Sequence, residues 1–334
     1  MTDTQSLLSA APIIRAIDIG YGRTKYTVDD EGTCRQFPSL APPADIHRTR
    51  SSVHRDRKTM EICVDGQLFE IGAETALFRQ EPVLHEGYME TPQYRALLYG
   101  ALRDMATPRI DLLVTGLPVL QHGPRAKPLQ DSLRGVHTVG PGIEVDIREV
   151  AVVVQPLGGL LAHSRERGGW AAREKRTFLV VDPGFHTVDW LMTRGLSEFP
   201  GRSGHIEGSV AEYLQRVRDQ LSLDIGARFP NLLAIDEGLR NGGFRVNGKS
   251  MDLSPYRRHA QPIVDRAIGA IRNAVGNGVD IDEIVLVGGG GRYFQQGLEA
   301  AFPGRPIHES KDALFANVRG FHIIGQILCK CRGQ

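Results

Sequence analysis

The chain has 334 residues, which exceeds the roughly 250 to 300 residues at which single hydrophobic cores stop growing, so two domains are expected. Its 40 basic and 39 acidic residues leave a formal net charge of +1. This balance excludes a strong field for collecting nucleic acid or an anionic membrane surface. No 18 apolar residues run together and the start lacks a basic leader, so we expect a cytoplasmic protein.

The first predicted element is a buried strand that ends in an acid. Apolar residues from Ile13 to Ile19 predict this strand, and a second strand is expected to begin at Tyr26. The turn between Asp18 and Lys25 is polar and contains Gly20 and Gly22. Glycine lets backbone N–H groups approach an anion closely, so this turn is a candidate phosphate loop. An ordinary glycine-containing hairpin is the alternative.

Strands and helices then alternate along the first half. The stretch from Ser39 to Met60 is rich in proline and arginine and is expected to be an exposed loop. Its cations either face solvent or bind an acidic partner or a neighbouring subunit; they are Arg48, Arg50, Arg55, Arg57 and Lys58. After this loop we expect a hairpin about Asp65-Gly66 and a helix over 91–105. A strand over 109–118 comes next, and then a strand that runs into a helix over 148–163. The alternation indicates an α/β architecture.

The second half opens with a repeat of the first hairpin. After a charged join near residues 164–176, the segment 177–193 reads as strand, turn and strand. Asp182-Pro183-Gly184 in this segment repeats the pattern of Asp18-Ile19-Gly20. Two domains built alike are therefore predicted, each presenting an acid and a glycine at a strand end. Two such acids could face one polyphosphate only with a cation between them, and Mg²⁺ held by one or two carboxylates fits that requirement.

Two further glycine-containing motifs predict different structures. Residues 243–250 satisfy the Walker A pattern letter for letter, but no buried strand precedes them and Pro255 follows closely. Asn247-Gly248 instead favours a surface hairpin with Lys249 in solvent. In contrast, Gly288 to Gly291 follow a buried strand over 284–287 and precede a helix, where a phosphate or a flat base can approach bare backbone.

The ordered trio of motifs, at Asp18, at Asp182 and at Gly288 to Gly291, resembles the actin, Hsp70 and sugar-kinase superfamily of ATPases. Within it the chain is most similar to plasmid-segregation actins of the ParM/StbA type. The stretches RAIDIGYGRTKYTV, FPSLAP and VDPGFHTVDWL resemble the protein D family of the plasmid-borne PRTRC system. The resemblance implies two ribonuclease-H-like domains that close over ATP and Mg²⁺.

The resemblance also implies roles for individual residues. Asp18 and Asp182 would orient the metal and its waters. The β- and γ-phosphates would be held from one side by Gly20, Tyr21, Gly22 and Lys25, and from the other by Gly184, Phe185, His186 and Thr187. The adenosine would lie against Gly288, Gly289, Gly290 and Gly291, with Gly208 on a further nucleotide-side turn. Residues 316–326 resemble the connecting helix that acts as an interdomain hinge.

The hydrolytic position is filled by Gln155, where ParM-like relatives usually carry a glutamate before proline. An amide can orient a water but is no strong base, so positioning would supply most of the catalysis and hydrolysis could be slow. A strand-end polar residue without a role is the alternative for Gln155. His186 is expected to bind phosphate or face solvent, and Asp189 and Trp190 are expected to be structural.

The expected protein is an actin-like ATPase that assembles into filaments or acts as a switch in plasmid maintenance. Its expected domains are residues 1–165 with an insertion near 33–92, residues 166–311, and a C-terminal helix over 312–334 that returns to the first domain. Expected partners are further copies of the chain and a DNA-binding adaptor, with no direct nucleic-acid or membrane binding. Two rivals remain: a nucleotide-sensing scaffold without hydrolysis, and a small-metabolite kinase on the same fold.

Overall fold

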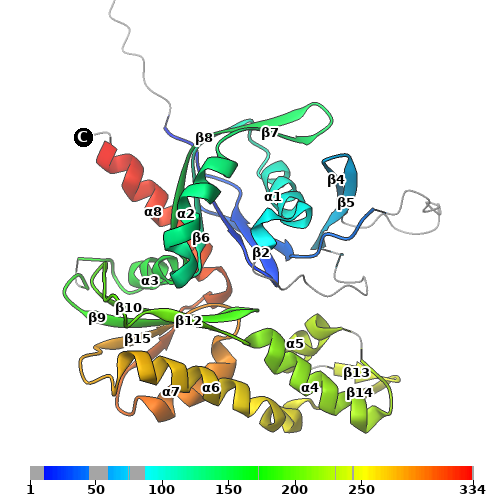
Figure 1. Ribbon diagram of the computed structural model, residues 1–334, viewed down its shortest axis with the longest axis vertical. Coiled ribbons are helices and arrows are strands. Elements are labelled where there is room, and N and C mark those ends of the chain that lie inside the picture. The colour runs from blue at the N-terminus through cyan, green and yellow to red at the C-terminus, as the bar shows by residue number, and fades with distance from the viewer. Residues whose placement is uncertain are drawn as a thin grey trace, which may run out of the picture.

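Two sheet-containing domains make up the protein, one above the other in Figure 1. The computed structural model describes residues 11–44, 59–73, 75, 87–171, 173–229, 231–242 and 244–332. The basic cluster from Arg48 to Lys58 lies outside these residues. Within the described chain, no helix combines the length and the apolar character that crossing a bilayer requires.

The first sheet has the strand order β3-β2-β1-β6-β8-β7. Strand β1 pairs antiparallel with β2 and parallel with β6, and β6 pairs parallel with β8. The strands are β1 (Ile14–Ile19), β2 (Arg23–Thr27), β3 (Cys34–Pro38), β6 (Arg109–Leu117), β7 (Gly135–Gly140) and β8 (Ile143–Val154). The end of β1 therefore lies in the middle of the sheet, at its carboxyl edge.

The second sheet has the order β11-β10-β9-β15-β16, with β12 also paired to β10. Strand β9 pairs antiparallel with β10 and parallel with β15, so the meander and crossover of the first sheet recur. Its strands are β9 (Thr177–Pro183), β10 (Thr187–Arg194), β11 (Ser197–Glu198), β12 (Gly204–Glu207), β15 (Glu283–Leu286) and β16 (Ile307–Glu309). The predicted internal repeat is confirmed at the level of sheet topology.

Helices cover both faces of each sheet. On the first sheet, α1 (Pro92–Asp104) and α2 (Val119–Leu133) pack on one face and α8 (Ala316–Arg332) on the other. On the second sheet, one face is covered by α4 (Val210–Ile225), α5 (Leu232–Asn241), α6 (Arg257–Val275) and α7 (Gly291–Ala301), and the other by α3 (Gln155–Glu166). Helices α3 and α8 lie between the two sheets and contact each other (Figure 1).

Two predicted hairpins are confirmed. Strands β4 (Thr59–Val64) and β5 (Gln67–Gly72) pair about Asp65-Gly66, and both turn residues have a positive φ. Strands β13 (Phe244–Val246) and β14 (Lys249–Met251) pair about Asn247-Gly248, where φ is again positive at both positions. The Walker A look-alike is therefore a hairpin turn with an exposed Lys249, because its backbone follows the type I′ geometry that Asn-Gly favours.

Candidate nucleotide site

The two repeated turns have the same backbone geometry. In the first, the N–H of Gly20 donates to the carbonyl of Arg23 at 3.2 Å, and in the second the N–H of Gly184 donates to the carbonyl of Thr187 at 2.8 Å. Gly20 and Gly184 each follow their aspartate by two positions, so the turns correspond residue for residue. Each sheet therefore presents one loop of the same design at the end of its first strand.

The two loops lie against each other across the interdomain boundary. The rings of Tyr21 and His186 are 4.7 Å apart. A Cβ at Gly22 would come within 2.9 Å of the Phe185 ring, so only glycine permits this approach of the loops. Burial lowers the pKa of His186, which keeps this imidazole neutral at pH 7.

One cavity between the domains brings together most of the predicted site residues. Its lining includes Asp18, Gly20, Tyr21, Gly22, Lys25, Gln155, Asp182, Gly184, Phe185, His186, Thr187, Gly288, Gly289 and Gly290. Residues from both loops, from the start of α3 and from the glycine run thus share one space. The cavity has the composition of a small-molecule site, with apolar walls and a few convergent polar groups.

Asp18 is held by two partners from different elements. It is 2% exposed at the end of β1. Lys25, directly opposite in the hairpin, donates from Nζ to Oδ2 at 2.9 Å. Gln155, the first residue of α3, donates from Nε2 to Oδ1 at 3.0 Å. The ion pair compensates a buried carboxylate, and the amide bond fixes the side chain of Gln155.

Asp182 has a different environment, because the residue opposite it in its hairpin is an acid. Asp189 pairs in register with Asp182, and both are buried. Burial raises the pKa of Asp182 to about 6, an effect that a hydrogen bond from Asn317 offsets and the charge of Asp189 increases. Burial also raises the pKa of Asp189 to about 6, against hydrogen bonds from Thr187 and the Val119 N–H. The charge of Lys25 acts in the opposite direction, but the pKa of Asp182 stays raised, so the two neighbouring buried acids favour an added cation.

Asp189 also joins the two domains. Its Oδ1 accepts from the N–H of Val119 at 3.0 Å, and Val119 is the first residue of α2 in the first domain. Its Oδ2 accepts from Thr187 Oγ1 at 2.7 Å. The residue was expected to be structural, and it indeed orders the loop that carries Thr187.

Two of the predicted glycines lie outside the cavity lining. Gly208 donates to the carbonyl of His186 at 3.0 Å and so supports the second loop from behind. Its φ of +79° and the adjacent Arg266 explain the need for glycine. Gly291 begins α7, where a Cβ would lie 3.1 Å from Glu309 Oε1. Their contact with a nucleotide stays a prediction.

The structure adds cavity residues that no short motif indicated. Tyr88 and Tyr94 come from the segment before and within α1, and Tyr88 stacks on Tyr21 at 4.7 Å. The far wall comprises Val210, Leu233, Asp236, Arg240, Leu314 and Asn317. Arg240 is held by Asp236 at 2.8 Å and by the carbonyl of Gly289 at 2.5 Å. The (i, i+4) spacing of Asp236 and Arg240 on α5 is a visible sequence signal for this ion pair.

Comparison with known proteins agrees with the paired loops and the repeated sheets. The family described as "Actin like proteins N terminal domain" matches residues 16–158, and "Archaeal actin homologue MreB-like, C-terminal" matches residues 180–300. The chain belongs to the actin-like proteins. No curated protein sequence matches it.

Solved structures share the actin-like fold over nearly the whole chain. The apo ParM protein of psk41 is 18% identical, with a TM-score of 0.69, and the alignment covers 96% of this chain and 99% of that one. The archaeal actin homologue Ta0583 is 20% identical, with a TM-score of 0.75 and coverages of 94% and 99%. ParM from a 15-stranded Clostridium botulinum filament is 17% identical, with a TM-score of 0.76 and coverages of 95% and 99%.

The donor set of this actin-like chain fits a magnesium nucleotide. The described residues contain no cluster of three acidic, histidine or cysteine ligands that would bind a metal alone. Mg²⁺ usually takes one or two carboxylates together with phosphate oxygens and waters, and Asp18 and Asp182 line the same cavity. The buried Asp182–Asp189 pair is the observation that favours a cation here, because two neighbouring carboxylates concentrate negative charge.

Proposed function

We propose that this actin-like protein binds ATP with Mg²⁺ in the interdomain cavity and hydrolyses it. The observation that carries the proposal is the pair of equivalent glycine loops, one from each sheet. Both loops line one cavity together with two buried aspartates. Backbone N–H groups and Lys25 supply the positive potential that a triphosphate needs. A solved structure of the archaeal actin homologue Ta0583, with a TM-score of 0.75, is a complex with ADP, which supports a nucleotide ligand for this fold.

In the proposed site, Asp18 and Asp182 would hold the metal, which would supply positive charge against the phosphates. The residues from Gly20 to Lys25 and from Gly184 to Thr187 bind the phosphates from opposite sides. Gly288, Gly289 and Gly290 present bare backbone to the nucleoside, next to the apolar wall of Val210, Leu233 and Leu314. Arg240 is fixed by two partners and is therefore preorganised beside this wall.

The hydrolytic step depends on Gln155. Its Nε2 is committed to Asp18, so the orientation of the amide is set before a nucleotide binds. The amide oxygen can then accept a hydrogen bond from the attacking water and orient it. An amide does not abstract the proton as a strong base would, so the rate comes from positioning and hydrolysis is slow.

Single-turnover ATP hydrolysis tests this assignment. Gln155→Ala is expected to lower the rate roughly 100-fold and to leave ATP affinity within a factor of a few, since the side chain orients water rather than phosphate. Equal background rates in wild type and variant would favour the scaffold without hydrolysis. ADP formation that requires an added sugar would favour the metabolite kinase.

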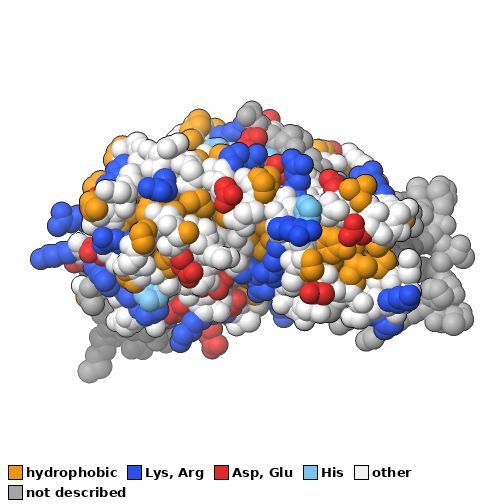
Figure 2. Space-filling view, turned by 90° about the horizontal axis from the view of Figure 1, so that it is seen from below, with side chains coloured by type: hydrophobic (Ala, Val, Ile, Leu, Met, Phe, Trp, Pro, Cys, Tyr) orange, Lys and Arg blue, Asp and Glu red, His pale blue; other side chains and the backbone are white. Residues whose placement is uncertain are grey.

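The biological use that we propose is nucleotide-dependent filament assembly in plasmid maintenance, in line with the PRTRC-type resemblance, which stays a prediction. The ParM filament from Clostridium botulinum has this fold, which supports assembly of further copies. On the face shown in Figure 2, Lys and Arg side chains are interspersed with acidic and apolar ones. Such a mixed face, with a net charge of +1, favours contact with DNA through an adaptor.

Light scattering and sedimentation with and without ATP test assembly. Growth of scattering on addition of Mg-ATP, with decay after hydrolysis, is the expected result. Monomers that persist at high protein concentration with ATP would contradict the filament, while leaving ATP binding to be judged by its own assay.

A further inference from the structure

The two helices between the sheets are exchanged between the domains. Helix α3 follows β8 of the first sheet, yet Leu160 and Ala162 pack on Phe178 and Val180 of the second sheet. Helix α8 follows the second sheet, yet Val318 and Phe321 pack in a cluster on the first sheet. Helix α8 therefore packs on the first sheet, whereas α3 lies between the sheets, because its Leu161 also packs in the first-sheet cluster.

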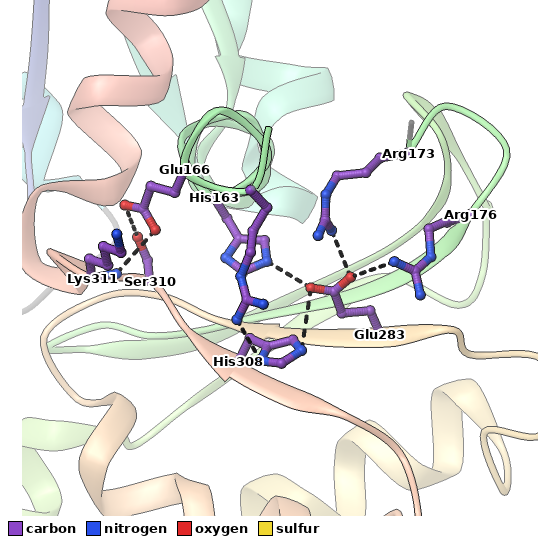
Figure 3. Close-up of polar contacts among 9 residues, drawn as sticks. His163, Glu166, Arg173, Arg176, Glu283, His308, Ser310 and Lys311 are labelled. Carbon is purple, nitrogen blue, oxygen red and sulfur yellow. Dashed lines mark hydrogen bonds and ion pairs between the residues drawn. The ribbon is translucent and has the colours of Figure 1, made fainter. Parts of the chain in front are cut away.

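Polar contacts fasten the end of α3 to the second domain (Figure 3). His163 Nε2 lies 2.7 Å from Oε1 of Glu283, a carboxylate that Arg173 also contacts at 2.6 Å. Glu166 Oε1 accepts from Ser310 Oγ at 3.0 Å. These partners lie near the start of β15 and just after β16. Burial alone would raise the pKa of Glu283, but the hydrogen bonds from His163 and Arg173 lower it to about 2.

The middle of α8 is held against the first domain by comparable contacts. The imidazole of His322 lies 3.2 Å from the carbonyl of Asp30. A Cβ at Gly325 would come within 2.6 Å of the Ile14 side chain, so the helix lies close against β1.

At their starts, both helices present an amide to one of the two cavity aspartates. Gln155 at the start of α3 donates to Asp18 at 3.0 Å. Asn317, in the first turn of α8, donates from Nδ2 to Asp182 Oδ2 at 2.6 Å. Asn317 is 5% exposed and lines the cavity, and its Oδ1 is buried without a hydrogen-bond partner. The two bonds occupy equivalent places in the repeated architecture.

We propose that Asn317 is the positioning residue for Asp182, the counterpart in the second domain of Gln155, so that each cavity aspartate is held by an amide from the first turn of a helix that lies between the domains. This inference rests on the proposed function of the same cavity. Both amides lie where the chain passes between the domains, since Gln155 directly follows β8 of the first sheet and Asn317 follows the segment 313–315, whose Ala313 carbonyl accepts from the Gly288 N–H. The placement of each acid therefore depends on the amide at the start of one of these helices.

The close crossing of α3 and α8 also holds the side chain of Asn317 in place. A Cβ at Gly320 would overlap the carbonyl oxygen of Gly158, so the backbones of α3 and α8 touch where they cross. A Cβ at Gly159 would lie 3.0 Å from Asn317 Oδ1. The amide of Asn317 is thus enclosed by α3 on one side and Asp182 on the other, which fixes its rotamer.

Two substitutions at Asn317 test the proposal. Asn317→Ala removes the donor, and Asn317→Asp keeps the shape but replaces the donor by an acceptor. The exposed Arg319→Ala on the same helix is the matched control. Measurements are single-turnover hydrolysis and the affinity of a fluorescent ATP analogue, each with Mg²⁺, and the same affinity in EDTA.

A positioning role predicts a rate roughly 10- to 100-fold lower in Asn317→Ala and a larger loss in Asn317→Asp. The Mg²⁺-dependent gain in affinity should shrink, while affinity in EDTA stays within about twofold. In a double-mutant cycle, Gln155→Ala and Asn317→Ala should lose less together than the sum of their separate losses, because both position acids that line one cavity.

Wild-type rates and wild-type Mg²⁺ dependence in both Asn317 variants would overturn the proposal alone. So would equal losses with and without Mg²⁺ that follow the melting temperature, since these indicate a purely structural role. A wild-type protein that binds no ATP would overturn the proposed function, and this inference with it.

Discussion

Lys25 and Asp189 occupy the same position in two repeated hairpins, each directly across from an aspartate that lines the interdomain cavity. In the first hairpin the carboxylate of Asp18 therefore has a cation 2.9 Å away, and in the second the carboxylate of Asp182 faces another acid. The repeat is thus symmetric in backbone and asymmetric in charge. This asymmetry gives the proposed magnesium site its acidic side and the phosphate site its basic side.

Loss of Lys25 should affect both stability and binding. Lys25→Met leaves Asp18 buried without its cation, and removal of one partner of a buried pair costs about 3 to 5 kcal/mol. Urea denaturation should show a loss of that order, and ATP affinity should fall about tenfold or more. Lys127→Met is the control, since its pair with Asp131 is exposed and is worth about 0.5 kcal/mol or less. Equal small effects in both variants would contradict the assigned role of Lys25.

The paired acids predict an unusual pH dependence of stability in EDTA. The pKa of Asp189 is raised to about 6 in the folded state, above the ordinary value near 4, so the folded state binds more protons in this window. Stability should therefore fall as pH rises from about 4.5 to 6.5. Asp189→Asn should reduce that fall by about 2 to 3 kcal/mol, as measured by denaturation at each pH.

The exposed Asp131→Asn is the control for that series. An unchanged pH profile in Asp189→Asn would show that the buried pair does not titrate in this range.

The Glu283 cluster should stabilise the protein in the opposite pH range. Glu283→Gln leaves the buried Arg173 without its anion and should cost about 3 kcal/mol at pH 7. The pKa of Glu283 is lowered to about 2, so its contribution is present above about pH 4.5 and is lost as pH falls toward 2. The difference in stability between wild type and variant should shrink over that range. The exposed Glu299→Gln should differ from wild type by about 0.5 kcal/mol or less.

The helix crossing predicts opposite effects for two glycine-to-alanine changes. Gly320→Ala would overlap the Gly158 carbonyl and should destabilise the protein by about 1 to 3 kcal/mol. Gly269→Ala, on α6 with open space around the added carbon, should stabilise it by about 0.5 to 1 kcal/mol. Thermal or urea unfolding of the two variants decides the point. A neutral Gly320→Ala would show that the helices do not need to touch.

The sequence predicts the two loops well because their physics is local. A buried strand, an acid and a glycine within three residues specify each loop, and the ordered repeat places both in one fold. The hairpins at Asp65 and Asn247 follow from their Asx-Gly turns for the same reason. The actin-like fold and family follow from the same motifs.

The remaining features depend on distant contacts. Helix α2 contains Pro124 and Pro128, which obscure its helical pattern, and sequence reasoning missed it. The contacts of Asn317 with Asp182 and of Asp189 with Val119 become visible only when residues more than 60 positions apart are brought together. Surface contacts for assembly carry no short motif, and the domain bounds 1–165, 166–311 and 312–334 stay a prediction.

ATP affinity of the Asp18→Ala/Asp182→Ala double variant, compared with wild type by calorimetry in Mg²⁺ and in EDTA, tests the central claim most directly. We expect the Mg²⁺-dependent part of the binding to disappear, because both carboxylates of the proposed metal site are gone. The double variant should remain folded by circular dichroism. Unchanged Mg-ATP affinity in the folded double variant would contradict the account.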